Sequence, residues 1–297
     1  MSAEKRRILV TGATGQIGGE LVRLLAKDEK LEIVAAARNP EKAKSLGVPV
    51  VLLDYDREGT MAPALEGVDS VFMLTGYTVD MLKQSYALLN AAKRAGVKYV
   101  VHLGAPGHDN TEVAHWAWHQ FVERYIEWSG FAFTHLRPEL FMQNLLGYGG
   151  SQEEANGTIR HFVGNARISW VDTRDVAAVA AVALRNPAEH SGKTYHLGYD
   201  AKTYHEIAEI LTTAVGQPFT YEARPPEEFL NAMLSAGADV AYMNCVYQNW
   251  IDYEAGNIVG ADTIYDNFVA LTGRKPKSWA EFAKENAAAF SYSNATA

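Results

Sequence analysis

Three glycines in the segment Val10–Gly18 have a spacing that could bind a phosphate group. They follow a short apolar run, Ile8–Val10, and precede apolar residues at helical spacing. Gly12 would allow a tight turn, Gly15 would let the backbone approach a pyrophosphate, and Gly18 would let a helix pack on a strand. The N-terminus of such a helix adds free N–H groups and a positive dipole. The pattern therefore predicts a nucleotide-binding turn rather than a merely structural one.

A basic pair occupies the place where the cofactor's adenine ribose would lie. About 20 residues after the glycine turn, NAD-binding proteins place an acid that binds the free 2′-hydroxyl. This chain has Arg38 there, with Lys42 one helical turn later and no acid at the end of the strand. A guanidinium suits a 2′-phosphate, which it can bind through two hydrogen bonds. We expect NADP(H) rather than NAD(H) as the cofactor, with a solvated surface pair as the alternative.

Other cofactor residues are expected directly after the predicted strands. Asp54 and Tyr55 would lie beside the adenine, and residues 74–76 would line the pyrophosphate and the nicotinamide ribose. The full predicted cofactor set is Gly12, Thr14, Gly15, Gln16, Ile17, Arg38, Lys42, Asp54, Tyr55, Leu74, Thr75, Gly76 and Gly104.

Short apolar segments alternate with helical patterns over the first 140 residues. Strands are predicted at 8–10, 31–37, 48–53, 70–74, 99–103 and 132–136, with helices at 79–95 and 114–129 and a helix start at Asn39–Pro40. This alternation is typical of right-handed βαβ units and a parallel sheet covered on both faces. We expect an α/β fold, a Rossmann-type doubly wound parallel sheet with a smaller, mostly helical C-terminal substrate lobe. Residues 1–140 would form the NADP-binding core. Residues 141–297 would add returning strands at 168–171 and 195–197, a helix at 174–185 and the substrate-binding lobe.

The composition excludes several classes of protein. Of the 297 residues 48% are hydrophobic and 21% are charged, which is typical of a globular chain and not of a disordered, collagen-like or coiled-coil protein. The net charge of −8 makes nucleic acid a poor candidate partner. One cysteine, Cys245, excludes a disulfide framework. The longest apolar run, Val176–Leu184, is too short to span a bilayer, and the N-terminus lacks a signal peptide. We expect a cytoplasmic protein without a membrane partner.

The chain resembles the NmrA-like family of atypical short-chain dehydrogenases. The similar segments lie at 11–18, 37–39, 54–55, 135–144, 170–177 and 192–195, and the resemblance covers about residues 7–220. It implies an NADP-binding Rossmann fold. The family includes triphenylmethane, quinone, azo-dye and isoflavone-type reductases, and also cofactor-sensing regulators with no enzymatic role.

The chain departs from the short-chain dehydrogenases at their proton relay. Those enzymes carry Tyr-x-x-x-Lys on the helix after the fifth strand, where this chain has His115 and His119. Either histidine could protonate a reduced product, and His119 could also bind the nicotinamide ribose. A pair of structural histidines is the alternative. Since no acid or third histidine of matching spacing accompanies them, we expect no metal.

Aromatic residues gather on the segments expected to border the substrate. The predicted substrate residues are Trp116, Phe141, Asn144, Tyr148 and Trp250. A further aromatic stripe at 242–253 has near-helical spacing, which suits either a core or the wall of a pocket for a flat compound. These features predict an NADPH-dependent reductase of flat aromatic or conjugated acceptors, of quinone, azo or triarylmethane type, acting by hydride transfer. The alternative is a non-enzymatic NADP-binding redox sensor that acts through a protein partner. The expected partner of the reductase is a small aromatic substrate, with a homodimer left open.

Overall fold

The chain forms two compact units. The computed structural model describes residues 5–107, 109, 111, 113–147 and 154–292. The first unit, here called the sheet unit, comprises Met1–Asn110, Trp116–Arg137 and Thr173–His196. The second unit comprises Thr111–His115, Pro138–Asp172 and Leu197–Ala297. Each unit is thus assembled from separated segments of the sequence.

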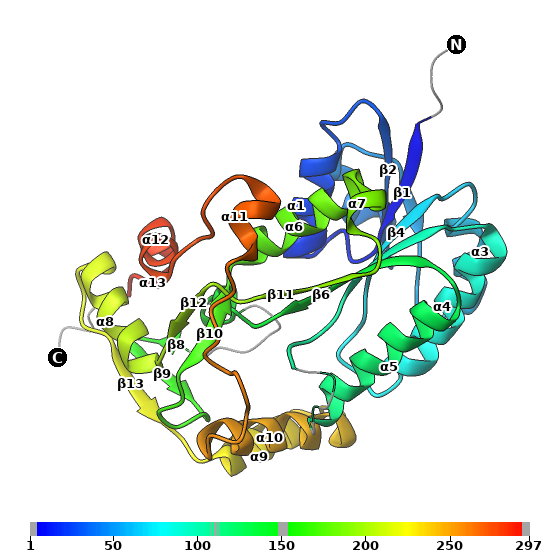
Figure 1. Ribbon diagram of the computed structural model, residues 1–297. Coiled ribbons are helices and arrows are strands. Elements are labelled where there is room, and N and C mark those ends of the chain that lie inside the picture. Colours follow the sequence, from blue (N-terminus) through cyan, green and yellow to red (C-terminus); the bar gives the residue numbers. More distant parts are fainter. Residues whose placement is uncertain (1–4, 108, 110, 112, 148–153, 293–297) are drawn as a thin grey trace. The chain divides into compact units, whose positions relative to one another are not determined.

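A seven-stranded sheet is the centre of the sheet unit, as the sequence predicted (Figure 1). Its strand order is β11-β6-β5-β4-β1-β2-β3, and the pairings from β3 through to β6 are parallel. The strands are β1 (Arg6–Val10), β2 (Leu31–Ala37), β3 (Val50–Leu52), β4 (Ser70–Leu74), β5 (Tyr99–Leu103), β6 (Ala132–Pro138) and β11 (Lys193–Leu197). The chain reverses direction across the sheet between β1 and β4, which is where ligands bind in sheets of this kind.

The register brings the carboxyl ends of the strands to one edge. Val10 at the end of β1 pairs with Ala35 of β2 and Phe72 of β4, and Leu74 pairs with Leu103 of β5. The residues that follow these strands therefore leave the sheet close to one another. The third strand is shorter than the predicted 48–53, and it begins only after Pro49, which has no N–H to donate to a neighbouring strand.

Helices cover both faces of this sheet. Within the sheet unit, α1, α6 and α7 lie on one face and α3, α4 and α5 on the other (Figure 1). The helices are α1 (Gln16–Leu25), α2 (Pro40–Ala43), α3 (Met61–Ala64), α4 (Met81–Ala95), α5 (Ala114–Trp128), α6 (Thr173–Arg185) and α7 (Pro187–His190), with 3-10 turns η1 (Lys44–Leu46) and η2 (Glu58–Thr60). Asn39 accepts a hydrogen bond from the Glu41 N–H and so caps α2, with Pro40 at its first position, as predicted.

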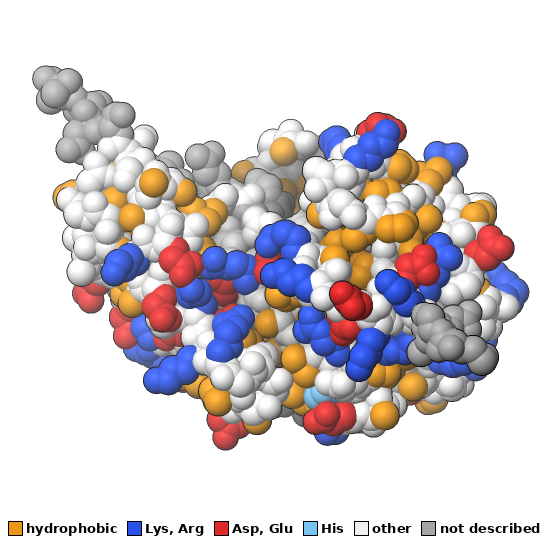
Figure 2. All heavy atoms as spheres, turned by 90° about the horizontal axis from the view of Figure 1, so that it is seen from above, with side chains coloured by type: hydrophobic (Ala, Val, Ile, Leu, Met, Phe, Trp, Pro, Cys, Tyr) orange, Lys and Arg blue, Asp and Glu red, His pale blue; other side chains and the backbone are white. Residues whose placement is uncertain are grey.

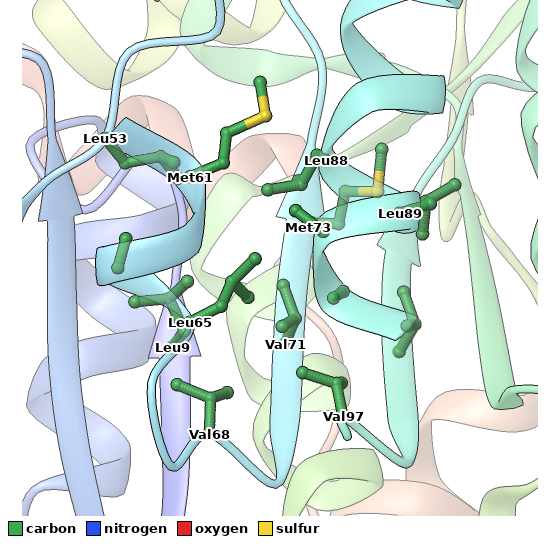
Figure 3. Packing of buried hydrophobic residues seen from close by; sticks show 14 of the residues in the cluster. Leu9, Leu53, Met61, Leu65, Val68, Val71, Met73, Leu88, Leu89 and Val97 are labelled. Atoms are coloured by element: carbon green, nitrogen blue, oxygen red, sulfur yellow. The ribbon is translucent and has the colours of Figure 1, made fainter. Parts of the chain in front are cut away.

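The core beneath α3 and α4 explains why these segments fold together. Leu9, Val71 and Met73 project from the sheet toward Met61 and Leu88, and all five are almost completely buried (Figure 3). Full burial of such a side chain contributes about 1.5–3 kcal/mol to folding. This packing fixes the strands whose ends carry the candidate site.

The second unit contains helices and two small sheets. Its sheets have the orders β12-β10-β7 and β13-β9-β8. The strands are β7 (Leu140–Phe141), β8 (Glu154–Ala155), β9 (Thr158–His161), β10 (Ile168–Val171), β12 (Asp200–Lys202) and β13 (Thr220–Ala223). The helical elements are η3 (Met142–Leu146), α8 (Tyr204–Val215), α9 (Pro226–Ser235), α10 (Val240–Glu254), α11 (Asn267–Thr272), α12 (Trp279–Glu285) and α13 (Ala287–Phe290). The sequence predicted β10 and the mostly helical character of this unit. It did not predict the other short strands, which contain only two to four residues.

The length of the helices and the charges on the surface bear on which partners the chain can bind. Among the helices of the described residues, none has both the length and the apolar character needed to cross a membrane. On the face drawn in Figure 2, Lys and Arg side chains are interspersed with Asp and Glu and with hydrophobic patches. This face therefore carries both signs of charge.

Candidate functional site

The turn between β1 and α1 has very close backbone packing. Gly12 has a φ of +61°, and a Cβ atom on it would lie 2.5 Å from Leu74 Cδ2. A Cβ atom on Gly18 would overlap the carbonyl group of Gly12. The Gly15 N–H donates a hydrogen bond of 2.9 Å to the same carbonyl. A side chain at position 12 or 18 would therefore push the turn apart.

The first turn of α1 offers N–H groups to a ligand. Gly15 is its N-cap residue, no side chain caps the helix, and the first turn contains no acid. Thr14, Gly15 and Gln16 are exposed, whereas Ile17 is buried, so that Ile17 could contribute only its backbone. The N-terminus of a helix in this state attracts an anion through its N–H groups and its dipole.

Hydrogen bonds tie the ends of β1, β3 and β4 together. The Thr11 hydroxyl donates to the Phe72 carbonyl at 3.0 Å and accepts from the Leu74 N–H at 3.0 Å. The hydroxyl of Tyr55, which follows β3 and the half-buried Asp54, donates to the Leu74 carbonyl at 2.7 Å. Burial raises the pKa of Tyr55 to about 12, so that this hydroxyl keeps its proton at neutral pH. This network holds the ends of β3 and β4 beside the glycine turn.

Arg38 and Lys42 are both exposed at the end of β2 and in α2. Within the described part of the chain, neither side chain forms an ion pair. Two unpaired cations at the end of the second strand are available to an anionic group.

The remaining predicted cofactor residues follow β4 and β5. Because Leu74 and Leu103 are partners in the register, Thr75 and Gly104 leave the sheet at the same level. Gly76, one residue further, is exposed. The structure thus brings the predicted cofactor residues to one edge of the sheet unit.

The two predicted catalytic histidines differ in their surroundings. They lie one turn apart on α5 and both are half-buried. Burial lowers the pKa of His115 to about 4, and its ring centroid lies 6.2 Å from that of Tyr242. The ring of His119 lies 5.6 Å, between centroids, from that of the buried His102. His115 is therefore neutral at pH 7, which makes it the weaker candidate for a proton donor.

The predicted substrate residues do not share one environment. Trp116 is only 5% exposed and thus offers little surface. Phe141, at the end of β7, and Asn144, in η3, are half-buried. Tyr148 lies outside the described residues. Phe141, which is apolar, and Asn144, which is polar, therefore both keep surface that a ligand could contact.

Trp250 is part of an aromatic cluster in the second unit. Its ring packs edge-on against His161 at 4.7 Å and against Phe229 at 6.1 Å, and it lies 6.2 Å from the ring of Tyr253. Of the stripe that surrounds it, Tyr242 and Tyr253 are buried. These contacts favour a core role for the stripe over the wall of a pocket.

Glu139 is a buried acid that the sequence analysis did not select. It is 7% exposed, and burial raises its pKa to about 8, so that the carboxyl group holds a proton at pH 7. A Cβ atom on Gly198 would lie 2.6 Å from Glu139 Cγ, which shows how tightly the backbone packs on it. The signal available in the sequence was an acid directly after the apolar β6, but nothing there indicated burial.

The sequence is similar to known proteins along most of its length. The sequence matches the model of the NmrA-like family over residues 4–283. It is 36% identical to an NAD(P)H azoreductase of Xenophilus azovorans over 294 residues, which is 95% of this chain and 99% of the relative. It is 32% identical to quinone oxidoreductase 2 of Escherichia coli over 77% of this chain and 82% of that relative.

A solved structure agrees with these relatives. The triphenylmethane reductase of Citrobacter sp., complexed with NADP(H), superposes with a TM-score of 0.79 and 27% sequence identity, covering 94% of this chain and 99% of that one. The family match spans nearly the whole chain. This chain therefore belongs to the NmrA-like family.

Proposed function

We propose that this chain reduces flat, conjugated acceptors of the quinone, azo or triarylmethane type, using NADPH. That it is an oxidoreductase with NADP(H) as its cofactor follows from its family and from the reductases to which it is similar. The observation that carries the cofactor assignment is the uncapped α1 N-terminus together with the unpaired Arg38.

The residues at the edge of the sheet unit fit this cofactor. The N–H groups of Thr14 to Ile17 would hold the pyrophosphate, where Gly12 and Gly18 leave no room for a side chain. Arg38 and Lys42 would bind the 2′-phosphate, and Asp54 and Tyr55 would flank the adenine. Residues 74–76 and Gly104 would line the nicotinamide ribose. When bound, NADPH supplies the hydride.

The acceptor needs a proton as well as a hydride when its reduction produces a basic atom. We assign this proton to His119, since burial holds His115 neutral. Imidazole titrates near neutral pH, which suits a general acid. His119 would also hydrogen-bond to the nicotinamide ribose, in place of the lysine of the short-chain dehydrogenases.

The acceptor class is inferred from the aromatic residues and from the relatives. The similar proteins are named azoreductase, quinone oxidoreductase and triphenylmethane reductase, and these names denote conjugated groups. We propose that Phe141 and Asn144 contact the acceptor. An aromatic contact adds about 0.5–1.5 kcal/mol beyond burial, so several could bind a dye-sized molecule without ion pairs.

The function is tested by NADPH consumption with a panel of quinones, azo dyes and triarylmethane dyes. We expect acceptor-dependent oxidation of NADPH with at least one of these compounds. R38A should weaken NADPH binding by about tenfold to a hundredfold, since a charge-assisted hydrogen bond contributes about 1.5–3 kcal/mol, and should change NADH binding much less. K30A, which removes an exposed cation just before β2, is the matched control.

Two results would contradict the proposal. Equal affinities of the unmutated protein for NADPH and NADH would remove the role of Arg38. NADP(H) binding without oxidation by any acceptor would instead favour the redox sensor, the candidate that the missing Tyr-x-x-x-Lys motif supports.

A further inference from the structure

Two buried histidines lie side by side in the sheet unit, away from the predicted cofactor residues of the glycine turn. His102 of β5 and His135 of β6 are direct partners in the parallel register, and both are completely buried. Glu123 of α5, which is 1% exposed, lies beside them. One ligand atom from each of the three side chains lies within 4.8 Å of the others. Over the described residues, no other group of three His, Cys, Asp or Glu side chains comes this close.

The ring nitrogens of these histidines lack protein hydrogen bonds. Among the residues that the structure describes, neither Nδ1 nor Nε2 of His102 or of His135 has a hydrogen-bond partner. The nearest acid to His135 is Glu127, whose Oε1 lies 3.4 Å from Nε2. A buried polar atom without a hydrogen-bond partner lowers the stability of the fold. In native proteins such an atom calls for an explanation, such as a bound water molecule or ion.

The Glu123 carboxylate of the cluster is bound by a guanidinium group. Arg137 donates to both oxygens of Glu123, at 3.0 and 2.6 Å, and also to Asp109 at 2.7 Å. Asp109 also pairs with Arg124 at 2.9 Å, so that it is shared between two guanidinium groups. A carboxylate offers about four lone-pair sites, of which Arg137 occupies two on Glu123.

A cavity lies beside Arg137, the residue that binds Glu123. It has a volume of about 510 Å³, is lined by Glu127, Arg137 and His196 among others, and includes Asp109, whose side chain is 66% exposed. On the other side, a Cβ atom on Gly104 would lie 3.2 Å from Glu123 Oε1 and 3.4 Å from His102 Cε1. Because Gly104 has no side chain, the Glu123 carboxylate and the His102 ring have space to approach each other.

We propose that His102, His135 and Glu123 bind one divalent transition-metal ion, with zinc as the ion that the ligands fit best. Two imidazoles and one carboxylate are a known zinc-ligand set, whereas magnesium and calcium prefer oxygen ligands alone. Water would complete the coordination. Binding requires the three side chains to rotate from their present separation to metal–ligand distances of about 2.0–2.2 Å. The site would tie α5 to β5 and β6. It uses none of the residues assigned to cofactor binding or proton transfer, so that its failure would leave the proposed function intact.

The first test is zinc binding to the full-length protein after dialysis against a chelator. Calorimetric titration with zinc chloride should give one site per chain. H102Q and H135Q should each weaken binding by more than about a hundredfold, since even the loss of an outer-shell partner costs tenfold to a hundredfold. H205Q, which removes an exposed histidine of α8, should bind zinc as the unmutated protein does. Cobalt should give the visible absorption of a tetrahedral site in the unmutated protein and lose it in H102Q.

A second measurement keeps the proposal testable where the buried variants fail to fold. Crystals of the unmutated protein soaked in zinc should show an anomalous peak bonded to His102 and His135. A peak only at surface histidines, or no zinc bound by the folded protein, overturns the proposal. Unchanged affinity in folded H102Q and H135Q overturns it equally.

Discussion

Gly18 packs on the carbonyl group of Gly12 so closely that a methyl group would not fit between them. A Cβ atom on Gly18 would overlap that carbonyl and would lie 3.0 Å from Ala13 Cα. These contacts are to backbone, which cannot move aside as a flexible side chain can. The first turn of α1 therefore depends on a glycine at this position for its fit against the end of β1.

The first prediction concerns this contact. G18A should raise the Kd for NADPH by at least about tenfold, because the displaced turn no longer presents its N–H groups together. G19A is the matched control, since a Cβ atom there would lie 3.3 Å from the Ala13 carbonyl oxygen and 4.0 Å from Leu46 Cδ2, without overlap. Titration of both variants with NADPH gives the two Kd values. Circular dichroism confirms that both variants are folded. Equal affinities in the two variants would mean that Gly18 serves packing alone.

The second prediction concerns the histidines of α5. H119A should reduce kcat/KM by about tenfold to a hundredfold, which is the size of losing one good hydrogen bond or a modest proton donor. H115A should do less, because burial keeps that imidazole neutral. H205A, on the exposed side of α8, is the control. Steady-state kinetics that are unchanged in the H115A/H119A double variant would show that both histidines are structural.

The third prediction separates core from pocket at Trp250. W250A should lower the free energy of unfolding by about 3–5 kcal/mol, because its ring packs on His161, Phe229 and Tyr253. W128A removes the same side chain from a position that is 78% exposed and should change stability by less than about 0.5 kcal/mol. Urea unfolding measures both. A stable W250A with a raised KM for large acceptors would place Trp250 in the substrate pocket instead.

The fourth prediction follows from the raised pKa of Glu139. The folded protein holds this proton up to about pH 8, whereas the unfolded chain releases it near pH 4.5. Stability should therefore be greatest below the unfolded value and should fall as the pH rises through this window, by about 2–4 kcal/mol from this group. E139Q, which is neutral at every pH, should lose this component of the slope and be more stable than the unmutated protein at pH 8.5.

The control for that experiment is E209Q, which changes an exposed acid of α8. It should keep the pH dependence of the unmutated protein. If E139Q and the unmutated protein have parallel unfolding free energies from pH 5 to pH 8.5, Glu139 is ionised in the fold and the account of its burial is wrong.

The sheet and the glycine turn could be predicted from the sequence because their signals are local. The spacing of Gly12, Gly15 and Gly18 and the apolar runs each depend on a few neighbouring residues. The same holds for Asn39 as the cap of α2. Small strands such as β7, with two residues, carry too little pattern to be recognised.

The features that could not be predicted depend on contacts between distant segments. His102 and His135 become neighbours only through the register of β5 and β6, and Glu123 joins them from α5. Burial, which the sequence does not state, gives Glu139 its raised pKa. For Trp250 the spacing left core and pocket open, and only its aromatic neighbours distinguish them.

The most direct test of the central claim is hydride transfer itself, followed in a single turnover. NADPH carrying deuterium at the transferable C4 position would be mixed with the enzyme and the best acceptor of the panel. The account predicts that the deuterium leaves the cofactor, that acceptor reduction slows relative to unlabelled NADPH, and that R38A needs more cofactor to reach the same rate. NADPH that stays bound and unoxidised in the presence of every acceptor would contradict it.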